Sequence, residues 1–423
     1  MKKELFSSLI AFLMLCPNCL HAAGYDTQVF DKLLKSLQVE VDGTAQEAPI
    51  IELNGNKQIL IDFDYLLPEA ARFDYSIIHC DADWTPSALA PIEYMDGFNG
   101  LSINDYSNSI NTTVQYVNYQ LLLPNDDVKF KVSGNYVVKV YNEDDPSKVV
   151  FTACFSVMEP QVTIGATVSS NTDIDQNKTH QQVSFSINHR GYQILQPLAE
   201  LKIRVLQNRR RDNVVSNVQP SSILPDQLVY ANNRSLIFNA GDEYRRFEFL
   251  SHKYNGMNVD HISFHNPYYH VELYKDINRS KQTYQYDQDQ DGRYFPACSS
   301  CNNAGTEADY YVVHFALDAP SKLNGSVFLN GNLVNNQLTE ENEMDYNEIT
   351  KQYEKSIFLK QGNYNYQYLF VPNGGSTGET ATFEGDFYQT ENEYSIYVYH
   401  RPIGSRYDRL IGTSVVRNTM KVF

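Results

Sequence analysis

The sequence predicts an all-β protein built from tandem immunoglobulin-like β-sandwich domains behind a cleaved signal peptide. Apolar and polar residues alternate with a period of two in segments such as 59–66 and 73–80, which is the spacing of a strand with one buried face. The chain contains 31 Tyr and 22 Phe, and aromatic residues favour strands. Helical patterns are scarce, and the best of them covers residues 31–37. Short strands at regular spacing are typical of β-sandwiches.

The first 23 residues have the pattern of a secretory signal peptide. Lys2 and Lys3 provide the positive start, an apolar run covers residues 9–15, and the small residues Ala22 and Ala23 offer a cleavage site. The apolar run is too short to serve as a membrane anchor. We therefore expect residues 1–23 to be removed on export.

A lipoprotein is an alternative interpretation of the same segment, because Cys16 and Cys19 could carry lipid. They follow Leu15 and Asn18, where lipid attachment would require a small residue. No later stretch approaches 18 consecutive apolar residues. We expect an exported protein that is soluble or peripheral in the periplasm and has no transmembrane anchor.

The mature chain is expected to form three units: an N-terminal β-sandwich over 24–160, a β-rich middle domain over 161–305 and a C-terminal sandwich over 306–423. Residues 134–155 have the pattern of a long-looped β-hairpin that closes the first unit. A polar loop at 276–309, which carries a Cys pair, separates the other two.

The C-terminal unit resembles the early-set sandwich of glycogen- and starch-binding modules. Its strand-like segments include 311–317, 325–331 and 353–359. Those modules stack sugars on exposed tryptophan, but the only tryptophan of this chain is Trp84, outside the unit. The resemblance therefore concerns the fold, and an exported glycan-binding protein stays an alternative function.

An outer-membrane barrel is the strongest structural alternative, since the chain ends in Phe423 and is rich in tyrosine. The last strand of a barrel should present apolar residues in register with a terminal aromatic residue. Counting back by two from Phe423 gives Lys421, Thr419 and Arg417, which form a polar face. The pattern favours sandwiches over a barrel.

The acidic motif at 287–292 is a candidate metal site. Asp287, Asp289 and Asp291 stand at every second position and are closed by Gly292, which is the spacing of the first half of a calcium-binding loop. The twelfth position, where a bidentate Glu should stand, is Cys298. An EF-hand is excluded, and we expect a solvated acidic turn and no cofactor, with Ca²⁺ bound by these three aspartates as the alternative.

Cys298 and Cys301 are predicted to form a local disulfide. Zinc would need a second Cys pair, and a redox pair normally opens a helix, whereas these residues lie in a loop. Cys80 and Cys154 lie in strand-like runs, and their pairing is left open.

Other reactive groups do not form a recognisable active site. His252, His261, His265 and His270 are interpreted as ordinary strand and turn residues, with a metal site as the alternative. No nucleophile elbow or phosphate loop is present, and we expect no enzyme. The 34 Lys and Arg against 51 Asp and Glu give a net charge of −17, which excludes a nucleic-acid partner.

Asp81 and Asp83 stand two residues apart beside Trp84. A glycosidase needs two carboxyl groups facing each other across a cleft. Two aspartates this close at a strand end more often cap a turn, which is the interpretation preferred here.

Several motifs occur together along nearly the whole mature chain. They are His79-Cys80-Asp81-Ala82-Asp83-Trp84 with Ser87, Leu89, Glu93, Tyr94, Gly97 and Phe98, followed by residues 106–112, 291–294, 384–392 and 407–412. In combination they resemble the signature of the type IX secretion system plug protein family.

The resemblance implies an exported, β-rich, non-enzymatic subunit. It implies that the partner is the outer-membrane translocon barrel of the type IX secretion system, whose periplasmic opening the plug closes. No catalytic residues are implied. The conspicuous candidates for contacting the translocon are the loop 81–98 and the aromatic stretch 388–399.

Overall fold

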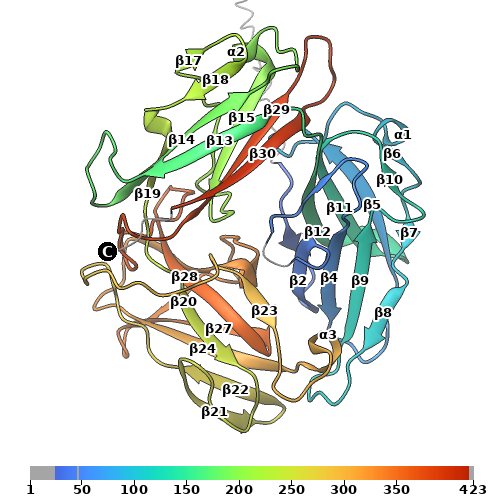
Figure 1. Cartoon of the computed structure of the whole chain (residues 1–423). Coiled ribbons are helices and arrows are strands. Elements are labelled where there is room, and N and C mark those ends of the chain that lie inside the picture. The colour runs from blue at the N-terminus through green and yellow to red at the C-terminus, as the bar shows by residue number, and fades with distance from the viewer. Residues whose placement is uncertain (1–23, 45–46, 419–423) are drawn as a thin grey trace, which may run out of the picture.

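The computed structural model describes residues 24–44 and 47–418, so the predicted signal peptide lies outside the described part. Almost all regular structure is strand, arranged in several mainly antiparallel sheets (Figure 1). The predicted all-β sandwich class is confirmed. Within the described residues no helix has the length and apolar character needed to cross a membrane.

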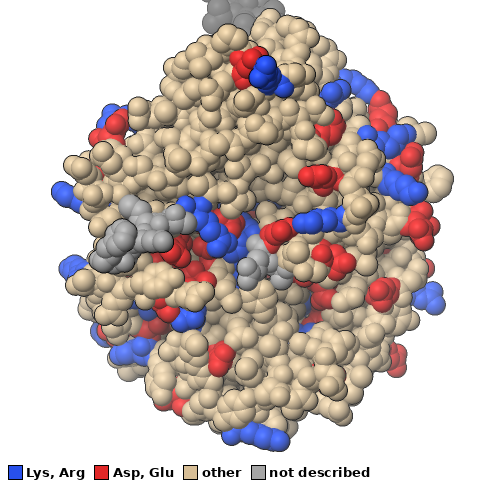
Figure 2. Space-filling model, viewed as in Figure 1, with Lys and Arg blue, Asp and Glu red and all other residues tan. Residues whose placement is uncertain are grey.

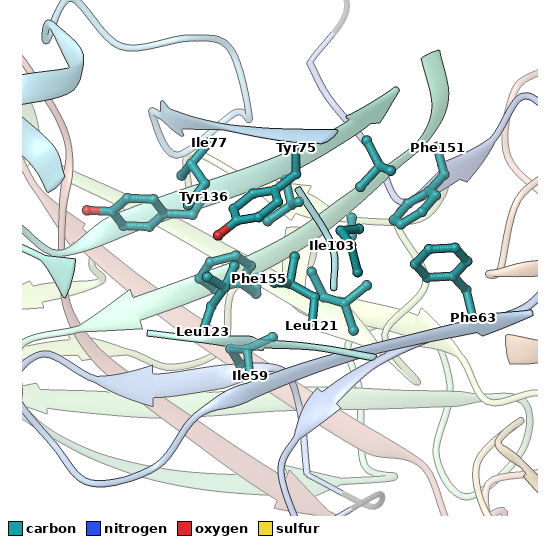
Figure 3. Close-up of a cluster of buried hydrophobic side chains, with 14 of the residues drawn as sticks. Ile59, Phe63, Tyr75, Ile77, Ile103, Leu121, Leu123, Tyr136, Phe151 and Phe155 are labelled. Atoms are coloured by element: carbon teal, nitrogen blue, oxygen red, sulfur yellow. The ribbon is translucent and has the colours of Figure 1, made fainter. Parts of the chain in front are cut away.

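The first unit is a sandwich of two sheets with orders β1-β12-β11-β5-β7 and β2-β4-β9-β8; β3 pairs with β12 in parallel. Alternating residues of β4 and β5 point into its core, where Phe63 stacks on Tyr119 with ring centroids 5.0 Å apart. Phe63 also meets Phe151 at a centroid distance of 4.8 Å (Figure 3). The predicted hairpin is β11 with β12. The elements are β1 (Gln28–Val29), β2 (Leu34–Val41), β3 (Ile50–Glu52), β4 (Ile59–Tyr65), β5 (Phe73–Cys80), α1 (Pro91–Tyr94), β6 (Met95–Asp96), β7 (Leu101–Ser102), β8 (Asp105–Asn108), β9 (Val117–Leu123), β10 (Lys129–Phe130), β11 (Gly134–Asn142) and β12 (Asp145–Met158).

The segment 31–37, which had the best helical pattern, leads into strand β2 instead. Leu34 and Leu37 are both buried, and their spacing of three imitates one helical face. Strand β2 buries both leucines because it contains an irregularity: Ser36 has a φ of 54°, and the register against β4 shifts there. A bulge of this kind turns two residues of one strand to the same side.

The second unit packs a sheet of order β13-β14-β18-β17, with β19 also on β14, against a sheet of order β16-β15-β29-β30. Its core is aliphatic with a few aromatic rings. The elements are β13 (Thr163–Ser169), β14 (His180–Asn188), α2 (Pro197–Glu200), β15 (Leu201–Gln207), β16 (Val215–Ser216), β17 (Ser222–Ile223), β18 (Gln227–Tyr230), η1 (Arg234–Leu236), β19 (Ile237–Asn239), β29 (Glu393–His400) and β30 (Arg409–Arg417).

The third unit packs β20, β28, β23 and β25 against a sheet of order β21-β22-β24-β27-β26 around an aromatic core. The elements are β20 (Arg245–Phe249), β21 (Val259–His265), β22 (Tyr268–Leu273), β23 (Tyr294–Pro296), α3 (Ala304–Glu307), β24 (Tyr310–Asp318), β25 (Gly325–Asn330), η2 (Asn332–Val334), β26 (Asp345–Asn347), β27 (Gln352–Lys360) and β28 (Gly362–Pro372).

Strand pairing divides the chain differently from the predicted units 161–305 and 306–423. Strand β15 pairs with β29 along its whole length, and β20 pairs with β28. Both pairings cross the predicted boundary. The chain therefore leaves the second unit after β19, builds the third unit, and returns with β29 and β30 to complete the second.

Candidate functional site

The three aspartates of the acidic motif are each held by donors of the protein. Asp287 forms an ion pair with Arg246, and Asp291 accepts a hydrogen bond from Arg293 at 3.1 Å. Asp289 accepts the backbone N–H of Asp291 at 2.9 Å, and burial raises the pKa of Asp289 to about 7. In the described ranges, no group of three or more His, Cys, Asp or Glu residues is placed to hold a metal ion. The expected solvated turn is therefore only partly present, since Asp287 is exposed and ion-paired, whereas Asp289 and Asp291 are largely shielded and bonded to protein donors.

A disulfide joins Cys298 and Cys301 in the connection between β23 and α3, with a Cα–Cα distance of 5.5 Å. The bond closes a short loop whose Ser299 N–H donates to the carbonyl of Leu250 at 3.0 Å. Cys80 and Cys154 are free and buried. Strand β11 lies between their strands β5 and β12.

The four histidines singled out in the sequence do not form one site. His265 and His270 have ring centroids 5.1 Å apart, whereas His252 and His261 contact other residues. His270 Nδ1 instead lies 2.8 Å from Nε2 of His314, a residue of β24 that no local pattern indicated. Parallel pairing of β22 with β24 brings the two rings together.

Asp83 caps a turn, as the sequence indicated, whereas the Asp81 carboxylate joins two units instead of capping the turn. Asp83 accepts hydrogen bonds from the N–H and hydroxyl of Thr85. Asp81 forms an ion pair with Arg401 at 2.5 Å. The backbone N–H of Ala82 donates to Asp408 at 2.9 Å. These contacts attach the first unit to the β29–β30 turn of the second.

The two stretches proposed as contact candidates have different environments. In 388–399, Tyr394, Ile396 and Val398 of β29 are fully buried in the second unit, so this stretch is core. The loop 81–98 begins at the joint with Arg401 and carries two highly exposed apolar side chains, Ile92 in α1 and Phe98 after β6.

Those side chains belong to a surface that we call the apolar end. It is formed by Ile92, Phe98, Leu195, Leu198 and Ile403, which are 76%, 80%, 69%, 59% and 73% exposed. Four of the five most exposed large hydrophobic residues in the described chain are among them. Exposed apolar side chains that lie close together can form an interaction surface.

Specific contacts hold the segments of the apolar end together. Arg406 in the β29–β30 turn forms an ion pair with Glu93 of α1. Glu200 of α2 lies 3.3 Å from Nε2 of His400, and its carbonyl accepts the N–H of Arg401. Helix α1, helix α2 and the β29–β30 turn therefore lie at the same end of the molecule (Figure 1).

Together, the fold and this surface define a class: a multi-sandwich β-protein whose most distinctive surface suits contact with another macromolecule. The model of the "Type 9 secretion system plug protein 1st domain" matches residues 34–159, which is the first sandwich from β2 onward. Residues 34–159 therefore carry the first domain of the type IX secretion system plug protein family. This family is not an enzyme family.

A solved structure matches nearly the whole chain. The crystal structure of a hypothetical protein from Parabacteroides merdae ATCC 43184 is 61% identical, with a TM-score of 0.93. The match covers 93% of this chain and 100% of that one. No curated protein matches the chain.

Proposed function

We propose that this protein is a non-enzymatic periplasmic plug that seals the periplasmic opening of the type IX secretion translocon in the outer membrane. The observation that carries the proposal is the family match of the first sandwich. Within this proposal the translocon barrel is the partner, and the apolar end is the surface that contacts it.

The construction of the body supports this role. A plug must cover a wide opening without deforming, and ion pairs join the three units. Lys360 with Asp64 joins the third unit to the first, Arg293 with Glu393 joins the third to the second, and Arg401 with Asp81 joins the second to the first. Release on demand favours an interface of moderate size with a few apolar anchors and a polar surround. The apolar end has this composition, since Glu93 and Arg406 lie among its exposed apolar residues.

Deletion of the gene tests the role. We expect the outer membrane to admit large hydrophilic antibiotics while cargo export continues, because a body that only blocks a pore contributes no chemistry to transport. Deleting the translocon as well should restore the barrier. Normal permeability after the single deletion, or equal leakage after the double deletion, would contradict the proposal.

Export is part of the same proposal. We expect a mature N-terminus near Gly24 and recovery of the protein in the soluble or peripheral periplasmic fraction. Mass spectrometry of the purified protein measures the N-terminus directly. A diacylated Cys16 or Cys19 at the N-terminus would instead show a lipoprotein.

A further inference from the structure

A cavity of about 170 Å³ lies where the three units meet. Its walls include Asp26 and Trp84 from the first unit, Arg204 and Tyr397 from the second, and Arg293 and Asn336 from the third. In Figure 2, charged side chains of both signs gather around the hollow in the middle of this face. A cavity of about 150 Å³ accommodates a ligand the size of benzene, so this one has room for a group of amino-acid size.

The cavity is cationic although the chain has a net charge of −17. Its charged wall residues are four arginines and a single carboxylate, Asp26. Asp26 pairs with Arg211 at 2.9 Å. Arg209 and Arg293 both pair with Glu393, at 3.2 and 2.9 Å. Arg293 also pairs with Asp291 at 3.1 Å, so three of the four arginines have a carboxylate partner.

Arg204 is the arginine without a counter-ion. Within the described part of the chain its guanidinium makes no hydrogen bond or ion pair, although the side chain is half buried. Burial lowers its pKa, with a contribution from Arg211 in the same direction, while Tyr399 and Asp83 act to raise it. In addition, Nε of Arg293, a residue only 3% exposed, has no hydrogen-bond partner. Unpaired cationic donors that are shielded from water are costly, and an anion in the cavity would give Arg204 a partner.

The remaining walls suit an organic ligand. Trp84 has a φ of 67°, which is rare for a bulky residue, and the guanidinium of Arg211 lies 4.1 Å from the centre of its ring. Asn335 and Asn336 both have a φ of 54° and line the cavity with Gln38. Strained residues concentrate at ligand sites, and side-chain amides offer both donors and acceptors.

We propose that this junction cavity binds a carboxylate-bearing group of amino-acid size, with Arg204 as its principal partner. The planar guanidinium matches a carboxylate with two parallel hydrogen bonds. The aromatic walls would cover the apolar part of the ligand, and the amides would bind its polar part. The ligand is either a small free dicarboxylate or the acidic terminal residue of a peptide. This inference does not depend on the plug role, because it uses only the cavity.

Tryptophan fluorescence tests the proposal directly, since Trp84 is the only tryptophan and lines the cavity. The mature protein is titrated with succinate, with an acetylated pentapeptide that ends in Asp, and with inorganic phosphate. We expect a saturable change with succinate or the peptide. If succinate binds, the carboxylate belongs to a small free dicarboxylate. If the peptide binds and succinate does not, the carboxylate belongs to the acidic end of a peptide.

Variants then locate the binding. Arg204→Gln should raise the dissociation constant by roughly tenfold or more, as expected for loss of a charged hydrogen bond. Arg204→Lys should raise the dissociation constant by a smaller factor. Arg234→Gln, which removes an arginine 74% exposed outside the cavity, is the matched control and should bind as wild type. Far-UV circular dichroism verifies that each variant is folded.

Three results would overturn the proposal. They are no saturable change with either carboxylate at millimolar concentration, tighter binding of phosphate than of both carboxylates, and unchanged binding by folded Arg204→Gln. The first two use the wild-type protein alone, so the proposal remains falsifiable even if the glutamine variant does not fold.

Discussion

Lys360 Nζ lies 2.6 Å from Oδ2 of Asp64, and the two side chains, from different units, are 2% and 0% exposed. The carboxylate also accepts hydrogen bonds from Tyr310 OH at 2.6 Å and from Asn118 Nδ2 at 2.9 Å. The ammonium donates to the carbonyl of Gly305 at 2.7 Å. Since both charges are fully coordinated, this pair fixes the third unit to the first in one orientation.

Replacing Lys360 by Met should therefore destabilise the protein by about 3–5 kcal/mol, because Asp64 would remain buried without a counter-charge. Urea or thermal unfolding of the mature protein measures the change. Lys57→Met is the matched control, since Lys57 and its partner Glu47 are more than half exposed, and such pairs contribute at most about 1 kcal/mol.

The double variant Lys360→Met with Asp64→Asn separates charge from packing. It should recover part of the lost stability, because no unpaired charge remains. Equal stability of Lys360→Met and wild type would show that this pair does not hold the units together.

Local patterns in the sequence predicted strands well and the connection of the units poorly. The alternation in 59–66 and 73–80 corresponds to β4 and β5, because burial of one face imposes a period of two. That period carries no information about which distant strand completes a sheet. The pairing of β15 with β29 across the whole third unit was therefore not predictable, and neither was the insertion of the third unit.

Local sequence patterns also could not predict the apolar end, because its residues come from segments far apart in the chain. Ile92, Leu195 and Ile403 are individually ordinary loop residues, and only the packing of α1, α2 and the β29–β30 turn brings them together. An apolar residue between polar neighbours in a loop is the one local signal available, and it is weak. The acidic motif misleads for the opposite reason, since its spacing suggests a cation, whereas Arg246 and Arg293 provide the positive charge.

Glu243 should make the protein less stable as the pH rises. The side chain is 2% exposed, and burial raises its pKa from 4.5 to about 8. Between these values the unfolded chain loses the proton and the folded chain keeps it. The contribution to stability is therefore fully present below pH 4.5 and is lost as the pH rises toward about 8.

Glu243→Gln should remove this dependence. Its amide oxygen can still accept the hydroxyl of Tyr284 and the N–H of Glu391. We expect the variant to exceed wild type by on the order of 2–4 kcal/mol at pH 8 and to match it near pH 4.5. Melting temperatures across this range measure the difference, with the exposed Glu348→Gln as control. A gain that does not change with pH would contradict the assignment.

Cys80 and Cys154 should be unreactive in the folded protein. Both are buried and unpaired, and burial raises the pKa of the Cys154 thiol to about 11, which disfavours the reactive thiolate. Titration of the mature protein with a thiol reagent should detect neither thiol under native conditions and both in denaturant. If neither thiol reacts in denaturant, Cys80 and Cys154 form a disulfide with each other.

Phe98→Ser together with Ile403→Ser should weaken binding to the translocon without lowering stability. Both side chains are more than 70% exposed, so the folded protein loses little packing, whereas an interface would lose two apolar anchors. Co-purification with the translocon and antibiotic permeability measure the effect, and the variant should leak like the deletion strain. Ile349→Ser is the matched control, since Ile349 is 93% exposed in the third unit, outside the apolar end. If the double variant seals normally, the apolar end is not the contact surface. The plug role itself is tested separately by deletion of the gene.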